Sequence, residues 1–212
     1  MYTIEKRAIV KVDMKDKTIK CLQYNRWYHA TSTSGFQSIC ANGVIAQHNI
    51  GHELDFGYGF YLCTTQEAAE NYIARLRDLY PDEELIIIEF DFCPFDWFQG
   101  SDFNTKTFEN YDDEFAEFVL YNRTENVWGE NQHPYDCIYG VMSDSLPTRI
   151  VQDYKAGIIT KESAIEDLKK STSVKQISLH NQTLCDTLTL TKAYAYDSIL
   201  VQRKELNINE YR

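Results

Sequence analysis

Positive charge is scarce in this chain. Its 212 residues include 21 Lys and Arg against 32 Asp and Glu, which gives a formal net charge of −11 at pH 7. Lys and Arg contacts to phosphate dominate nucleic-acid binding, so this balance argues against a large electrostatic footprint on DNA or RNA. A local basic patch is still compatible with the composition.

Long apolar segments are missing as well. The chain has no run of about 18 apolar residues, and its N-terminus lacks the apolar core of a secretory signal. We therefore expect a cytoplasmic protein with no membrane span and no membrane partner. Export by a specialised route stays open.

Paired cysteines are also absent. The six cysteines, at positions 21, 40, 63, 93, 137 and 185, form no C-x-x-C pair and no His/Cys metal spacing. This pattern argues against a zinc site and against a dense disulfide framework. We expect reduced, buried thiols and no metal ion.

Neither internal repeats nor a low-complexity linker interrupt the chain, and 43% hydrophobic residues are enough for one good core. We expect one domain over residues 1–212 with an α+β fold. Residue patterns predict strands at 4–12 and 18–24, paired as a hairpin, and at 27–30, around 61, 84–92, 135–142, 174–180 and 198–202. Helices are predicted at 36–40, after Thr65, near 115–122 and at 161–170. Residues 44–54 suit a mobile loop over a ligand.

Two short motifs point to a binding site. A predicted strand at 26–31 carries a lone histidine, His29, and a glycine-rich segment leads to Tyr61, with Tyr72 eleven residues later. Glycines let the backbone approach a ligand closely, and two tyrosines can hold a planar heterocycle between them. Together the motifs indicate a site for a flat ring.

These residues resemble the His-Tyr-Glu ADP-ribosyltransferases, which include diphtheria-like toxins and the poly(ADP-ribose) polymerases. In that family the histidine opens the NAD site, and two tyrosines eleven residues apart sandwich the nicotinamide. Blocks at 118–123, 135–140 and 176–180 are similar to those of a bacterial branch, the DUF3990 group. The resemblance covers most of the chain and implies an ADP-ribosyltransferase-like split β-sheet core with flanking helices.

The resemblance also assigns roles. It implies NAD contacts from His29, Ala30, Thr31, Gly59, Tyr61 and Tyr72, and catalytic roles for His29, Tyr61 and Gln176. His29 and the backbone beside Ala30 would anchor the adenosine ribose and the carboxamide end, while the two tyrosines would stack the nicotinamide. Ala30 stands where many relatives carry glycine, which narrows the room for backbone contacts.

Position 176 departs from the family pattern. A glutamate begins the corresponding strand in the family, and this chain has Gln176. An amide can hydrogen-bond a ribose hydroxyl but lacks the charge that favours an oxocarbenium-like state. Loss of one preorganised stabiliser typically costs about a hundred- to a thousandfold in rate. The missing stabilisation of the transition state would then have to come from another carboxylate, with Glu117 as a candidate, or from attack by the target nucleophile.

Each of these residues also has a structural interpretation. His29 could be a satisfied core histidine, and both Tyr61 and Tyr72 could simply pack in the core. Asp55 could cap or close a turn. The Asn-Arg pair at 122–123 resembles a recurring family pair, but it could equally end a solvated helix.

We therefore expect an NAD-dependent mono-ADP-ribosyltransferase, a glycosyltransferase that releases nicotinamide. Polymer growth is not expected, because the glutamate that activates an acceptor ribose is absent. The alternative is a catalytically silent NAD-binding or protein-interaction module of the same fold, which Gln176 supports. The expected partners are NAD as co-substrate and a protein or nucleic-acid acceptor. A toxin, effector or phage-defence role would add an antitoxin protein.

Overall fold

One mixed β-sheet organises the described part of the chain. The structure, a computed structural model, describes residues 14–126, 133–143, 147–170, 174–197 and 199–211. Eight strands in these ranges follow the order β4-β5-β6-β2-β1-β3-β7-β8, and only β4 and β5 are parallel. The strands are β1 (Arg26–Ser32), β2 (Phe60–Cys63), β3 (Leu85–Asp91), β4 (Thr105–Phe108), β5 (Cys137–Val141), β6 (Lys175–Leu179), β7 (Thr189–Asp197) and β8 (Gln202–Glu205). The predicted α+β class is confirmed.

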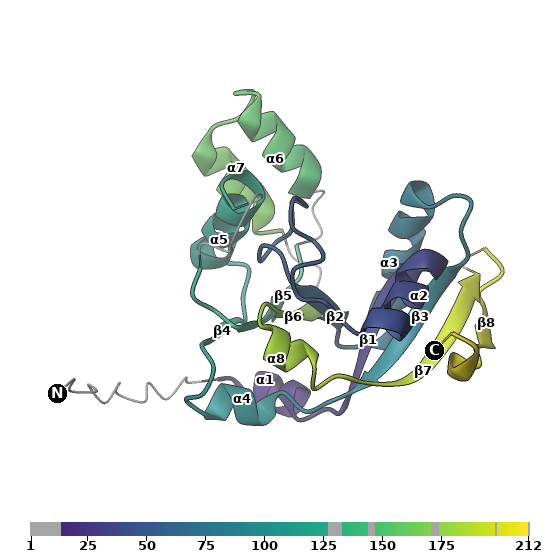
Figure 1. Cartoon of the computed structure of the whole chain (residues 1–212). Helices are drawn as coiled ribbons and strands as arrows, with labels where there is room; N and C mark the ends of the chain where they lie inside the picture. The colour runs from purple at the N-terminus through teal and green to yellow at the C-terminus, as the bar shows by residue number, and fades with distance from the viewer. Residues whose placement is uncertain (1–13, 127–132, 144–146, 171–173, 198, 212) are drawn as a thin grey trace.

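Helices cover both faces of this sheet. Figure 1 shows α5, α6 and α7 gathered at the β4–β5 end, whereas α2 and α3 lie beside β1 and β3. The helices are α1 (Asp16–Leu22), α2 (Thr33–Asn42), α3 (Gln66–Leu79), α4 (Phe95–Gln99), α5 (Asp113–Thr124), α6 (Pro147–Lys155), α7 (Lys161–Leu168) and α8 (Gln182–Cys185), followed by a short 3-10 turn, η1 (Ile208–Glu210). None of these helices is both long and apolar enough to cross a membrane.

The core is divided into three clusters by the sheet. Side chains of α1, α2, α4 and α8 pack with Trp27 and Phe60 on one face. On the other face, α5, α6 and α7 enclose Phe56, and α3 packs separately over Ile87. The predicted central strand at 84–92 is confirmed as β3, whose apolar residues are buried on both faces.

The two strands that carry the sequence motifs pair at a single point. β1 pairs with β3 along its whole length, but its pairing with β2 consists of Tyr28 opposite Cys63. From His29 onward β1 and β2 separate, which leaves backbone groups of β2 without a ladder partner on that side. We call this point the β1–β2 junction.

Helix caps follow the sequence pattern. Ser32 accepts a hydrogen bond from the Gly35 amide at the start of α2, and Thr65 does the same for Ala68 at the start of α3. Gly43 ends α2 with a φ of 75°, a conformation that favours glycine. Both predicted helices are confirmed.

The strand predicted at 18–24 is wrong, because most of this segment lies in α1. Thr18 and Leu22 are four residues apart and both fully buried, as one helix face requires. Asp16 in the first turn and Lys20 in the last turn also favour a helix through its dipole. Burial of this helix face therefore decides the structure against the strand that the apolar alternation predicted. The partner strand predicted at 4–12 lies outside the described residues.

The strand predicted at 198–202 is also wrong, because residues 199–201 form the turn between β7 and β8. The carboxylate of Asp197 accepts hydrogen bonds from the backbone amides of Ile199, at 2.8 Å, and Leu200, at 3.1 Å. A side chain that satisfies two successive amides closes a turn. The residues of this turn are apolar, as in a strand, but they are exposed and pair with no other strand in the described sheet. Strand β7 was not predicted from the sequence.

Val201 in this turn has a φ of 52°, which is unfavourable for a β-branched residue. We expect Val201→Gly to raise the free energy of unfolding by about 1 kcal/mol, measured by urea denaturation. Leu200→Gly is the matched control, because Leu200 has a negative φ; it should lower stability by up to about 1 kcal/mol. Equal losses in both variants would contradict the strain at Val201.

Candidate functional site

The three residues predicted to be catalytic lie on three neighbouring strands. His29 is on β1, Tyr61 on β2 and Gln176 on β6, and these strands are adjacent in the order β6-β2-β1. Antiparallel pairing sets Gln176 opposite Cys63, and Tyr61 opposite Ser178. The fold therefore gathers residues that are up to 147 positions apart in the sequence.

His29 fills the β1–β2 junction. Its Nδ1 lies 2.8 Å from the carbonyl oxygen of Tyr61, one of the backbone groups left unpaired where the strands separate. A carbonyl only accepts, so Nδ1 carries the proton and Nε2 of the neutral ring is an acceptor. The imidazole also packs on Phe60, with ring centroids 4.4 Å apart. The histidine thus has a structural hydrogen bond through Nδ1, and Nε2 has no hydrogen-bond partner within the part of the chain that the structure describes.

The ring of His29 is neutral over the physiological range. Burial, against the opposing effect of the Tyr61 carbonyl and with a smaller contribution from His48, lowers the pKa of His29 to about 4. At pH 7 the imidazole therefore offers a hydrogen-bond acceptor rather than a charge.

The sheet places His29 and Tyr61 on opposite faces. Strand alternation sets His29 on the side of Trp27, which packs with Phe60. Tyr61 points to the other side, toward the α5–α7 cluster, and the register of β2 with β6 puts Gln176 on that side too. His29 and Gln176 therefore lie on opposite faces of the sheet.

Ala30 and Thr31 line the junction on β1. Ala30 is buried against the α3 cluster, on the face of Tyr61, while Thr31 is half-buried and alternates to the face of His29. Both pair with β3 on their outer side. Their edge toward β2 has no strand pairing in the described sheet, which is where a ligand could meet the backbone.

The hydroxyl of Tyr61 is already engaged. It donates to the carbonyl of Gly57 at 2.6 Å and accepts from the amide of Phe56 at 3.0 Å. Burial, followed by the charge of Asp55, holds the pKa of Tyr61 well above its usual range. The phenol therefore stays protonated and braces the turn, so its contribution to a ligand site is limited to its ring.

Tyr72 approaches Tyr61 from α3. The Tyr72 side chain is 37% exposed, and its charge is the last of several influences that raise the pKa of Tyr61. It shares its helix with Ile73, which is fully buried, so the ring stands at the edge of the core rather than within it. Tyr72 thus lies on the helix that follows the strand of Tyr61, and stacking of the two rings on a ligand stays a prediction.

Gln176 is buried against a carboxylate that the sequence pattern did not predict there. Its side chain is 5% exposed, and Nε2 donates to Oδ2 of Asp55 at 3.3 Å. Glu117, the candidate raised from sequence, is exposed on α5. The carboxylate that Gln176 contacts is therefore that of Asp55.

Asp55 anchors a buried polar network. Arg123 on α5 contacts Oδ1 of Asp55 through Nε at 2.8 Å and Nη2 at 2.7 Å. Ser143, just after β5, donates its hydroxyl at 2.7 Å and its amide at 3.2 Å. The network ties loop 55–59, α5, β5 and β6 together, so Asp55 does far more than close a turn. Ser143 carried no sequence signal.

Asn122 takes no part in this network. It is fully buried, donates from Nδ2 to the Phe118 carbonyl at 2.8 Å and accepts from Asn126 at 2.7 Å. Of the Asn-Arg pair at 122–123, Arg123 reaches the candidate site and Asn122 braces its own helix.

Two further histidines hold the glycine-rich loop, and sequence reasoning missed both. His133 Nε2 lies 2.8 Å from the Phe56 carbonyl, and His180 Nδ1 lies 2.5 Å from the Tyr58 carbonyl. Their rings meet edge to face at 4.8 Å. A Cβ atom at Gly59 would come within 2.8 Å of His180 Nδ1, so Gly59 has a packing reason to be glycine.

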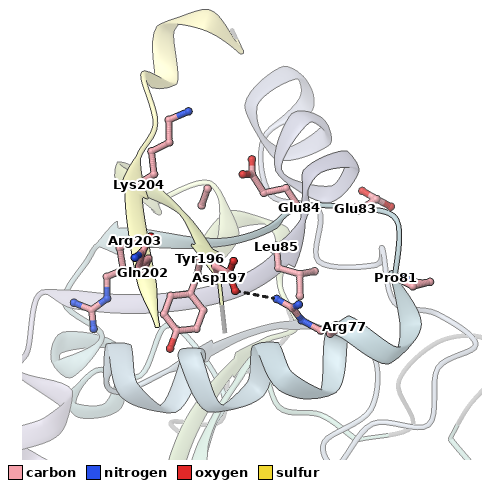
Figure 2. A pocket seen from close by; sticks show the side chains of 11 residues that line it. Arg77, Pro81, Glu83, Glu84, Leu85, Tyr196, Asp197, Gln202, Arg203 and Lys204 are labelled. Atoms are coloured by element: carbon pink, nitrogen blue, oxygen red, sulfur yellow. Dashed lines mark ion pairs between the residues drawn. The ribbon is translucent and has the colours of Figure 1, made fainter. Parts of the chain in front are cut away.

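Two cavities lie outside this group of residues. One of about 310 Å³ (Figure 2) lies between α3, β3 and the β7–β8 hairpin, where Arg77 Nη2 is 3.8 Å from Asp197 Oδ1. Another of about 460 Å³ is lined by Tyr28 and Thr64, next to the strand pair that opens the β1–β2 junction. Neither is lined by Tyr61 or Gln176, so the candidate site rests on the geometry of its residues.

The described features define an α+β protein with a histidine, a tyrosine and a glutamine on adjacent strands around a strand junction. Residues 28–190 match the family described as "Protein of unknown function (DUF3990)". This match spans well over half of the chain and includes all the candidate site residues. The chain belongs to the DUF3990 family. Neither curated proteins nor solved structures gave a match.

The neutral histidines predict acid sensitivity. An unfolded histidine takes up its proton near pH 6.5, whereas His29 does so at about pH 4 in the fold and His180, also mainly through burial, at about pH 3. The free energy of unfolding should therefore be fully present above pH 6.5 and fall as the pH drops toward 4. The contribution of His29 to this fall in the free energy of unfolding amounts to at most about 3 kcal/mol.

A pH series of urea denaturation tests this expectation. His29→Asn keeps a donor near the Tyr61 carbonyl but cannot titrate, so it should flatten the slope between pH 6.5 and 4. The exposed His52 provides the matched control, His52→Asn, which should leave the slope unchanged. An unaltered slope in His29→Asn would show that His29 titrates alike in both states.

The buried pair of Asp55 and Arg123 predicts a large mutational cost. Arg123→Met leaves the carboxylate without its cation and should lower the free energy of unfolding by about 3–5 kcal/mol. Lys155→Met, which breaks the surface pair with Glu53, should cost at most about 1 kcal/mol. Denaturant titration compares them, and similar small losses in both would mean that Asp55 is not confined as the structure describes.

Proposed function

We propose that this protein is an NAD-dependent mono-ADP-ribosyltransferase related to the His-Tyr-Glu group, with glutamine at the third position. The observation that carries the proposal is the hydrogen bond from His29 to the Tyr61 carbonyl at the β1–β2 junction, with Gln176 on the next strand. It joins residues of separate motifs at the place where the two strands part. A sequence resemblance alone does not require that arrangement.

The residues of the junction suit an elongated ligand with a flat ring at one end. Tyr61 on β2 and Tyr72 on α3 would supply the two aromatic faces between which a planar ring can stack. On the other face, Nε2 of His29 offers an acceptor to a ribose hydroxyl. NAD has both kinds of group, and a span through the junction would let one molecule meet both faces.

The proposed reaction breaks the bond between nicotinamide and the anomeric ribose carbon, and the acceptor nucleophile forms the new bond to that carbon. Gln176 would orient the reacting ribose by hydrogen bonding to a hydroxyl. Tyr61 and Tyr72 would hold the leaving ring, and the neutral His29 would fix the far ribose without moving a proton. Chain extension is not proposed, because an amide is a poor base for activating an acceptor ribose.

A second candidate function is a catalytically silent module of the same fold that binds NAD or a protein. The observation that favours it is the confinement of the site: Gln176 is 5% exposed and tied to Asp55, and the Tyr61 hydroxyl is engaged with the loop. In this case the polar network would serve stability alone.

The proposed acceptor is a protein or a nucleic acid. The net charge of −11 weighs against extended nucleic-acid contacts, although a small basic site would suffice for one base. A cytoplasmic toxin, effector or phage-defence protein with an antitoxin partner is the biological setting that we propose for such an activity.

Incubation with NAD labelled on its adenylate part tests the proposal. The purified protein is mixed with labelled NAD and a cell lysate, and protein is separated from nucleic acid before counting. Label in one fraction, together with released nicotinamide, supports the transferase and gives the acceptor class. Binding of NAD by calorimetry without label or nicotinamide release would favour the silent module, and no binding would contradict both.

Tyr72 offers a sharp test of the stacking site because it is exposed enough to be truncated in a folded protein. Tyr72→Ala should weaken NAD binding about three- to tenfold, since ring stacking contributes on the order of 0.5–1.5 kcal/mol. Tyr80→Ala is the matched control: Tyr80 follows α3 and is 39% exposed, close to the 37% of Tyr72. Calorimetry with a thermal melt compares them, and equal affinities would remove Tyr72 from the site.

A further inference from the structure

We propose that Asp55 is the positioning residue for Gln176, and that the two side chains together replace the single carboxylate found in the related enzymes. Asp55 would anchor the amide nitrogen, turn the amide oxygen toward the substrate and hold a negative charge one hydrogen bond away. This inference rests on the proposed function, because it concerns the ribose contact of that reaction.

The orientation of the Gln176 amide follows from its partner. A carboxylate accepts hydrogen bonds and donates none, so the group that faces Asp55 Oδ2 at 3.3 Å must be the NH₂ end. The oxygen, Oε1, then points away from Asp55. Among the described residues, Asp55 is the hydrogen-bond partner of the Gln176 side chain, which leaves Oε1 available as an acceptor for a ribose hydroxyl.

The charge of Asp55 is directed toward Gln176. Arg123 binds Oδ1, and Gln176 contacts Oδ2, so the cation and the amide lie at opposite oxygens of one carboxylate. Oδ2 also accepts from the hydroxyl of Ser143 at 2.7 Å and from its amide at 3.2 Å, so Gln176 shares this oxygen with Ser143. A hydrogen bond from N–H to an anion polarises the amide and strengthens Oε1 as an acceptor. Gln176 thereby recovers part of the hydrogen-bond acceptor strength and negative charge that a glutamate would supply.

The same geometry forbids a simple return to glutamate. Gln176→Glu would set two carboxylates side by side with Arg123 as their shared cation, and like charges at this distance cannot both ionise easily. The two carboxylates would then titrate as a coupled pair. The arrangement of Asp55 and Arg123 is thus matched to an amide at position 176.

Nicotinamide release measured across pH tests the proposal in four proteins. Asp55→Asn/Arg123→Gln removes both charges together, so no buried ion is left unpaired, and the rate should fall on the order of 10- to 100-fold in a folded protein. Gln176→Glu should show a new pH step that the wild type lacks. Asp55→Asn/Gln176→Glu, which moves the carboxylate from position 55 to 176, should lose that step and be faster than Asp55→Asn/Arg123→Gln.

Ser143→Ala is the matched control, because Ser143 contacts Asp55 but not Gln176. It should lower the melting temperature and leave the pH profile unchanged. Wild-type rates in folded Asp55→Asn/Arg123→Gln would overturn the proposal. So would a Ser143→Ala profile that shifts in the same way as that of Gln176→Glu, because Asp55 would then act through stability alone.

Amide exchange separates this inference from the proposed function. In protein labelled with ¹⁵N-glutamine, the Gln176 side-chain amide should exchange with water more slowly than that of the exposed Gln202. Equally fast exchange overturns the anchoring by Asp55, whatever the activity. Slow exchange in a wild-type protein that releases no nicotinamide overturns the proposed function and the catalytic half of this inference, while the contact itself stands.

Discussion

The buried carboxylate of Asp55 constrains the whole candidate site, because a charge out of water must be met by a cation and by hydrogen bonds. Arg123, Ser143 and Gln176 meet it from three different elements. Loop 55–59, which carries Asp55, also holds the Tyr61 hydroxyl through its backbone. The position of the tyrosine ring and the direction of the Gln176 amide therefore depend on one ion pair.

The β1–β2 junction is the second constraint. Two strands that separate leave carbonyls unpaired, and such groups need partners when they are buried. His29 satisfies the Tyr61 carbonyl through Nδ1, and burial keeps its ring neutral, so that Nε2 is an acceptor. The side chain that satisfies a backbone carbonyl can thus also accept a hydrogen bond from a ligand. Structural and functional interpretations of His29 do not exclude each other, and the same holds for Tyr61.

Much of the site was predictable because its signals are local. Tyr61 and Tyr72 occupy a strand and the capped helix that follows it, so their places on these elements follow from short-range rules. Asp55 and Ser143 were not predictable as partners, because they are 88 residues apart and only the sheet brings them together. The segments at 18–24 and 198–202 were misassigned because apolar alternation does not reveal which face is buried.

The sequence by itself determined the α+β class, the caps of α2 and α3, the central strand β3 and the set of residues that could form a site, because periodicity, caps and turns act over a few residues. Only the tertiary structure decided that Gln176 faces a carboxylate, that His29 and Tyr61 lie on opposite faces, and that Gly59 makes room for His180. Those facts depend on strand order and register, which long-range burial sets and no local pattern encodes.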